Sequence, residues 1–154
     1  MNSIIRKPKV LFLDLENCAG SQMAEAYLRY LAGDLFEAFS AGLEAHELSP
    51  AAVLVMDEVE IDISSHYCKN FEEFSTFHFK FVITLCELVR GRCPIFRFAE
   101  NFRHWDFPNT PIAQGSLQAE LEEIRGFRSL IEHRVWKFVC DNSLSSSDEA
   151  IVER

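Results

Sequence analysis

The chain has 154 residues, of which 48% are hydrophobic and 25% are charged, values that are ordinary for one soluble globular domain. Its formal net charge of −9 argues against nonspecific nucleic-acid binding and against attraction to anionic membranes. No apolar run approaches the roughly 18 residues of a membrane span, and the run that follows the basic N-terminus is too short for a signal peptide. We therefore expect a cytoplasmic protein whose five cysteines are reduced at rest.

The first part of the chain begins with a buried strand at Val10–Leu13, where apolar residues follow one another without interruption. A stripe of apolar residues at i, i+4 spacing predicts a helix over 21–32. Ser21 is its expected N-cap and Gly33 its expected stop. A second strand is expected at 35–41.

The next expected element is a helix that begins at Ser49, because a serine N-cap followed by Pro50 is a typical helix start. We expect this helix to end near residue 60. A short aromatic-rich helix or turn is expected at 71–77.

The second half of the chain continues the alternation of strands and helices. The continuous apolar run at 79–85 predicts a strand that helices cover on both faces, and 101–106 is expected to hold a shorter strand. A long helix is predicted over 116–140, and the Ser-rich, acidic segment 141–154 is expected to be a disordered tail. The pattern indicates one parallel α/β domain, residues 1–140, that binds ligands at the carboxyl ends of its strands.

The loop at 14–21, between the first strand and the first helix, is the first candidate site, because α/β proteins often hold anions there. It carries the carboxylates of Asp14 and Glu16 and neither lysine nor arginine. Asp14 could cap nearby amides while Glu16 points to solvent, or the two could bind a divalent cation together. As a third alternative, Asp14 could be the nucleophile of a hydrolase. We expect the first arrangement.

Several stretches together identify a likeness to a known family: VLFL, NCAGSQMAEAYLRYLAG, FEAFSAGLEAHELSPAAVLVMDEVEIDIS, FVITLCELVRGRCPIF and HWDFP. Over residues 9–138 the chain resembles the low-molecular-weight protein tyrosine phosphatase superfamily, and within it the thioredoxin-coupled arsenate reductases. The resemblance implies a three-layer α/β/α sandwich with a four-stranded parallel sheet, the low-molecular-weight phosphatase fold.

The chain departs from the family pattern at its catalytic positions. Relatives begin the loop with a nucleophilic cysteine and end it with an arginine that holds the oxyanion; here these positions hold Asp14 and Gly20. The general-acid aspartate corresponds to Asn109, which cannot protonate a leaving group. Asn17 and Ser21 match residues that brace the loop in relatives. The loop that the resemblance defines consists of Asp14, Leu15, Glu16, Asn17, Cys18, Ala19, Gly20 and Ser21.

The resemblance also points to redox candidates. Cys86 and Cys93 have the spacing of the second and third cysteines of the reductases, which relay a disulfide toward thioredoxin. Cys18, in the loop, could substitute for the missing first cysteine. Alternatively, Cys86 and Cys93 are retained only as packed thiols, since cysteine is a good small hydrophobe.

A cation site of some arsenate reductases has possible counterparts here in Asn17, Glu25 and Ser40. Lys69 stands where relatives offer an aspartate, so its ammonium could replace the ion and pair with Glu25 or Asp14, or it could lie exposed on a loop. The five histidines show no metal-ligand spacing. We therefore expect no metal and no other cofactor.

These observations predict a pseudoenzyme-like member of the family that lacks the nucleophile, the oxyanion arginine and the general acid. We expect a non-catalytic binding or regulatory protein with a protein partner, for which a thioredoxin-like protein is one candidate, and neither nucleic-acid nor membrane binding. The alternatives are a dithiol redox protein or arsenate-reductase-related enzyme that uses Cys86 and Cys93, and a hydrolase based on Asp14.

Overall fold

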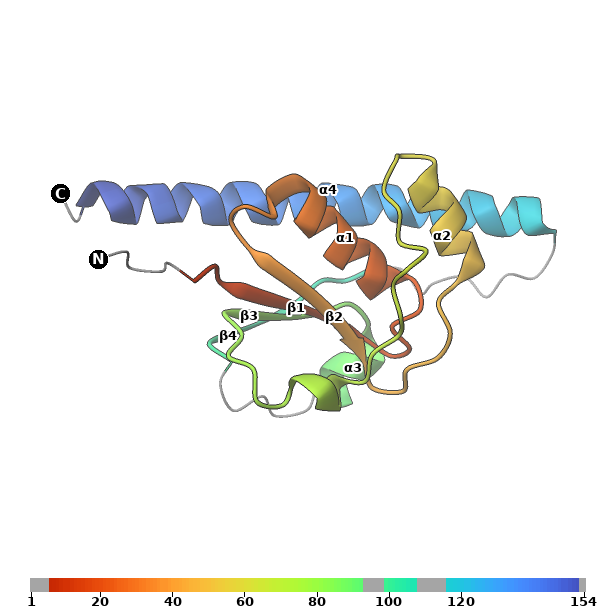
Figure 1. The fold of residues 1–154 in the computed structure, drawn as a ribbon, viewed down its shortest axis with the longest axis horizontal. Helices are drawn as coiled ribbons and strands as arrows, with labels where there is room; N and C mark the ends of the chain where they lie inside the picture. Colours follow the sequence, from red (N-terminus) through yellow and green to blue (C-terminus); the bar gives the residue numbers. More distant parts are fainter. Residues whose placement is uncertain (1–5, 93–98, 108–115, 153–154) are drawn as a thin grey trace.

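The computed structural model of the protein describes residues 6–92, 99–107 and 116–152. Its centre is one sheet of four parallel strands in the order β2-β1-β3-β4. The strands are β1 (Lys9–Asp14), β2 (Glu37–Gly42), β3 (Phe81–Thr84) and β4 (Asn101–His104). The helices are α1 (Gly20–Ala32), α2 (Pro50–Asp57), the 3₁₀ helix η1 (Phe71–Phe74), α3 (Glu87–Arg92) and α4 (Leu117–Val152). The α/β fold and the four-stranded parallel sheet are thus confirmed (Figure 1).

Helices cover both faces of the sheet. α1, α2 and α4 lie on one face, and η1 and α3 lie on the other (Figure 1). Because alternate side chains of a strand point to opposite faces, β1 divides its apolar residues between two cores. Val10 and Phe12 pack toward α1 and α4, whereas Leu11 and Leu13 pack toward η1 and α3. The molecule is therefore the three-layer sandwich that the sequence predicts.

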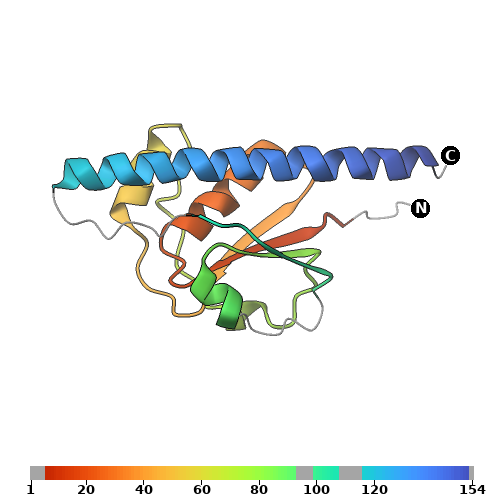
Figure 2. The ribbon, with the colours of Figure 1, turned by 180° about the vertical axis from the view of Figure 1, so that it is seen from behind.

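α4 is the outermost element of its layer. Seen from behind, it crosses in front of α1 and α2 and runs along the whole domain (Figure 2). Ile124, Phe127 and Ile131 on its inner side belong to the larger core. α4 continues to Val152, so the segment at 141–152, expected to be disordered, is helical in the structure. Among the described residues, no helix combines the length and hydropathy that a bilayer span requires.

Some element boundaries differ from expectation, and one helix was not expected. α1 begins at Gly20 after Ala19, which provides no capping side chain, so the prediction of Ser21 as N-cap is wrong. The Ser21 hydroxyl instead accepts a hydrogen bond from the side chain of Asn17. Ser49 does cap α2, since its hydroxyl accepts from the amide of Ala52. α2 ends at Asp57, before the expected residue 60, and the sequence did not predict α3.

Candidate functional site

The loop at residues 14–20 leaves the carboxyl end of β1 and leads into α1, next to the carboxyl end of β2. The loop packs closely on Gly42, the last residue of β2. A Cβ at position 42 would lie 2.8 Å from the carbonyl oxygen of Leu15 and 2.9 Å from the amide nitrogen of Asn17. Only glycine therefore allows this approach, and β2 helps to set the path of the loop.

The Asp14 carboxylate closes the loop from inside. Its Oδ1 accepts a hydrogen bond from the amide of Asn17 at 2.7 Å, and its Oδ2 accepts one from the amide of Ser21 at 2.9 Å. Burial is the largest influence on this carboxyl and raises its pKa, although the hydrogen bonds from Ser21 and Asn17 act in the opposite direction. Glu16 is exposed. This geometry is the amide-capping arrangement, the first of the three alternatives for Asp14.

Asn17 fixes the conformation of the loop. It is fully buried and has a φ of 55°, in the left-handed region that asparagine tolerates better than most residues. Its Nδ2 donates to the hydroxyl of Ser21 at 2.7 Å, while its Oδ1 accepts from Gln22 Nε2 at 2.9 Å and from the amide of Lys69 at 2.8 Å. The loop is therefore held to α1 and to the segment before η1 by side chains of the protein itself.

Gly20 faces an aromatic ring at the start of α1. A Cβ at this position would lie 3.1 Å from Cε1 of Phe127 and 3.6 Å from Oδ2 of Asp14. Phe127 comes from α4 and is buried. The space next to Gly20 is thus already occupied by Phe127 on one side and by the Asp14 carboxylate on the other, and Gly20 brings no positive charge to the loop.

The loop cysteine is held as a thiol. Cys18 Sγ donates to Oε2 of Glu16 at 3.4 Å. Burial, followed by the negative charges of Asp14 and Glu16, raises the pKa of Cys18 to about 12. Because the thiolate is the nucleophile in disulfide exchange, this environment disfavours Cys18 as the missing member of a relay.

Cys86 lies immediately before α3 and is half-buried. Burial raises its pKa, and the negative charge of Asp14 adds to the effect, although backbone hydrogen bonds oppose it. Cys93, its expected redox partner, and Asn109, the expected counterpart of the general acid, lie outside the described residues. The structure therefore gives no distance between Cys86 and Cys93.

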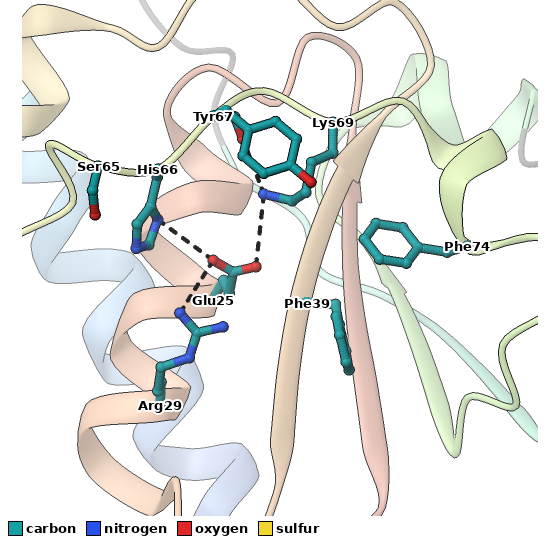
Figure 3. Close-up of a pocket in the computed structure, with 8 residues that line it drawn as sticks. All are labelled: Glu25, Arg29, Phe39, Ser65, His66, Tyr67, Lys69 and Phe74. Carbon is teal, nitrogen blue, oxygen red and sulfur yellow. Dashed lines mark hydrogen bonds and ion pairs between the residues drawn. The ribbon is translucent and has the colours of Figure 1, made fainter.

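A second group of polar residues surrounds the carboxylate of Glu25, which is 4% exposed on the inner side of α1 (Figure 3). Its Oε1 lies 3.9 Å from Lys69 Nζ and accepts from the hydroxyl of Ser40 at 3.3 Å. Its Oε2 lies 3.5 Å from Nδ1 of His66 and 3.7 Å from a guanidinium nitrogen of Arg29. Burial lowers the pKa of His66. A single buried carboxylate is thus shared by several cationic or titratable groups.

Lys69 is buried, with 7% of its surface exposed, and its Nζ also donates to the carbonyl of Tyr67 at 3.0 Å. Of the three expectations for Lys69, pairing with Glu25 is the one that the structure shows. Its ammonium and the guanidinium of Arg29 already supply positive charge around Glu25, so these residues do not fit an additional potassium ion. A cavity of about 310 Å³ adjoins the group and is lined by Glu25, Arg29, Phe39, Ser65, His66, Tyr67, Lys69 and Phe74 (Figure 3).

Gln22, a residue that was not expected in the site, joins the loop to the Glu25 group. Gln22 is fully buried in α1. Its Nε2 donates to the carbonyl of Tyr67 at 2.9 Å as well as to Asn17, and its Oε1 lies 3.0 Å from Nδ1 of His66. The available signal was a glutamine directly after the loop serine, in the first turn of the helix.

Comparison with known proteins gives consistent results. The model of the family described as "Low molecular weight phosphotyrosine protein phosphatase" matches residues 9–146. An arsenate reductase of Shouchella clausii (strain KSM-K16) is 34% identical over 132 residues, which cover 86% of this chain and 95% of the relative. The arsenate reductase of Bacillus subtilis (strain 168) is 33% identical over 129 residues, or 84% and 93% of the two chains.

Solved structures extend the comparison to three dimensions. An arsenate reductase in its oxidized state superimposes with a TM-score of 0.73 and 31% identity, covering 86% of this chain and 97% of the other. The tyrosine phosphatase Wzb from Escherichia coli K30, in complex with sulphate, gives a TM-score of 0.70 at 17% identity, with 88% and 99% coverage. The second likeness is one of fold alone.

Proposed function

Because the chain belongs to the low molecular weight phosphotyrosine protein phosphatase family, we propose that it uses the arsenate-reductase-like scaffold of that family as a binding or regulatory protein, without oxyanion chemistry. One observation carries the proposal. The Asp14 carboxylate accepts hydrogen bonds from the amides of Asn17 and Ser21, at the N-terminus of α1, where an anion would otherwise bind.

The charge of Asp14 opposes a second anion in the loop. Two like charges about 4 Å apart repel by a few kcal/mol at an effective dielectric constant of about 20. Gly20 supplies no cation to offset this repulsion, and the exposed carboxylate of Glu16 adds to it. Phosphate, sulfate and arsenate are therefore expected to be excluded from the loop.

The enzymatic alternatives receive less support from the site. Nucleophilic attack by Asp14 would have to come from a carboxylate whose two oxygens each accept a hydrogen bond from a loop amide, which lowers its nucleophilicity. A dithiol cycle would need a reactive thiolate, whereas burial raises the pKa of both Cys18 and Cys86. We propose that the partner is another cytoplasmic protein; a thioredoxin-like partner belongs to the less supported dithiol alternative, which would use Cys86 and Cys93.

Oxyanion titration tests the proposal. Wild-type protein and the variant Asp14→Ala are titrated calorimetrically with phosphate and with arsenate at neutral pH. We expect no binding to the wild type, and weak binding in the millimolar range to Asp14→Ala, whose loop amides no longer have a carboxylate partner. Glu16→Ala is the matched control, because it removes an exposed loop carboxylate that caps no amide, and it should gain no such binding.

Turnover provides the second half of the test. The wild-type chain is assayed for hydrolysis of p-nitrophenyl phosphate and for thioredoxin-coupled reduction of arsenate. We expect rates at background in both assays. Millimolar or tighter oxyanion binding by the wild type, or turnover above background, would overturn the proposal.

A further inference from the structure

Three side chains converge beside the carboxyl ends of β3 and β4, away from the Glu25 group. His104 ends β4, Asp106 follows it by two residues, and Glu87 opens α3. Nε2 of His104 lies 2.8 Å from Oδ1 of Asp106 and 3.3 Å from Oε2 of Glu87. One ligand atom of each residue lies within 4.8 Å of the other two, so that small movements of the exposed carboxylates would bring all three around a single metal ion.

The imidazole of His104 is held in place from its other side. Its Nδ1 lies 2.7 Å from Oγ1 of Thr84, and that hydroxyl donates to the carbonyl of Arg103 at 3.4 Å. The Thr84 hydroxyl can accept the Nδ1 proton of His104 or donate to Nδ1, depending on the tautomer of the ring. Thr84 is buried and the His104 side chain is only 12% exposed, so the ring cannot easily turn. Nε2 is therefore the atom presented to the two carboxylates.

The two neutral tautomers of His104 present different atoms to the carboxylates. With its proton on Nε2, the ring donates to Oδ1 of Asp106 at 2.8 Å. With its proton on Nδ1, it offers the lone pair of Nε2, and a metal ion between Nε2 and the two carboxylate oxygens then offsets their negative charge. In metal sites, a hydrogen-bond partner at the ring nitrogen that does not bind the metal orients the imidazole in the same way.

We propose that Glu87, His104 and Asp106 bind one divalent transition-metal ion. An imidazole nitrogen with two carboxylate oxygens suits Zn²⁺ and its first-row neighbours, whereas Mg²⁺ and Ca²⁺ prefer all-oxygen sites. The side chains of Glu87 and Asp106 are 72% and 86% exposed, so the ion remains open to solvent on one side.

Space is available for a further ligand of the ion. A cavity of about 340 Å³ adjoins the site and is lined by His104, Asp106, Phe107, Leu130, His133 and Arg134. Arg134 supplies a positive charge on its wall. The cavity can thus hold water or a small anionic group that completes the coordination. The inference is independent of the proposed function, because none of the three ligands belongs to the loop at 14–21.

The test uses the full chain after removal of bound metal with a chelator. Calorimetric titration with ZnCl₂ in a non-coordinating buffer at pH 7 should give one site per chain, with a dissociation constant in the micromolar range. Titration with MgCl₂ at the same concentrations should give no heat. Nitrogen NMR of His104 should show a large shift of Nε2 and little change at Nδ1 when Zn²⁺ is added.

Variants separate this site from binding to cysteines. Asp106→Asn and Glu87→Gln change exposed side chains and should each weaken Zn²⁺ binding at least tenfold. Glu100→Gln is the matched control, because Glu100 is also an exposed carboxylate near a histidine, with Oε1 3.6 Å from Nε2 of His78. It should leave the affinity unchanged. Absence of Zn²⁺ binding to the wild type, or binding that Asp106→Asn and Glu87→Gln leave unchanged, would overturn the inference.

Discussion

Replacement of Gly20 by alanine should destabilise the protein, although alanine is the better helix former. The new Cβ would lie 3.1 Å from Cε1 and 3.3 Å from Cζ of Phe127, closer than ordinary van der Waals contact. The ring cannot easily retreat, because Phe127 is buried and packs edge-on against Phe107, with ring centroids 5.4 Å apart. The contact between α1 and α4 must therefore absorb the overlap.

Two opposing effects set the magnitude. Overpacking of a well-packed core lowers the free energy of unfolding by about 1–3 kcal/mol. The change from glycine to alanine in a helix raises it by roughly 0.5–1 kcal/mol. We expect Gly20→Ala to lower the free energy of unfolding by about 0.5–2 kcal/mol. Gly126→Ala is the matched control, because a Cβ there meets nothing within 4 Å, so this variant should be stabilised by about 0.5–1 kcal/mol.

Urea denaturation of the single and double variants measures both effects at constant m-value. Phe127→Leu shortens the side chain that Gly20 faces, so Gly20→Ala should cost much less in the Phe127→Leu background. We expect a coupling energy of about 1 kcal/mol between the two positions. If Gly20→Ala stabilised the protein as much as Gly126→Ala, or if the coupling were absent, the steric reasoning would be wrong.

Three further predictions concern the loop and the surface. Because its pKa is raised to about 12, Cys18 should react with iodoacetamide at pH 8 on the order of 10³-fold more slowly than an unhindered model thiol, as peptide mass spectrometry can measure. The hydrogen bond from Arg125 is the largest of the effects that lower the pKa of Glu58 from 4.5 to about 2, so its contribution to stability should be full above pH 4.5 and lost as the pH falls to 2; the stability difference between wild type and Glu58→Gln should therefore be largest above pH 4.5 and shrink toward pH 2 in acid unfolding. The double variant Asp14→Cys, Gly20→Arg should hydrolyse p-nitrophenyl phosphate barely above background in a steady-state assay, and ordinary phosphatase turnover would contradict this.

The third of these predictions follows from the same crowding. An arginine at position 20 has the Cβ that Phe127 obstructs, and Glu16 would keep a carboxylate beside the restored site. The quadruple variant that adds Glu16→Gly and Asn109→Asp should be the more active of the two. The comparison of double and quadruple variants therefore tests the expectation that the loop differs from the family pattern at more than two positions.

The elements with strong local signals could be predicted from the sequence. The apolar run at Val10–Leu13 and the Ser49-Pro50 pair correctly indicated a strand and a helix start. The sequence did not predict α3, because its six residues include Gly91 and form no apolar stripe. That helix packs through Val89 onto the far side of the sheet, a tertiary contact that local pattern does not reveal.

The candidate site shows the same division. Its place after β1, the amide capping by Asp14 and the pairing of Lys69 with Glu25 were among the arrangements that the sequence predicted. The contact of Gln22 with Tyr67 joins residues far apart in the chain, as does the hydrogen bond between Thr84 and His104. Such contacts depend on how strands and loops are brought together, so a search for spacing among histidines alone could not find them.

The strand order has a consequence for synthesis of the protein on the ribosome. β1 is an inner strand, yet the chain makes it first, and only its β2 edge can be paired once the first helix crossover is complete. Its other edge must wait for β3, which emerges after α2 and η1. Closing so long a loop is slow. The nascent chain therefore carries an unpaired apolar strand edge until β3 has been made, and α4, which follows all four strands, covers the larger core later still.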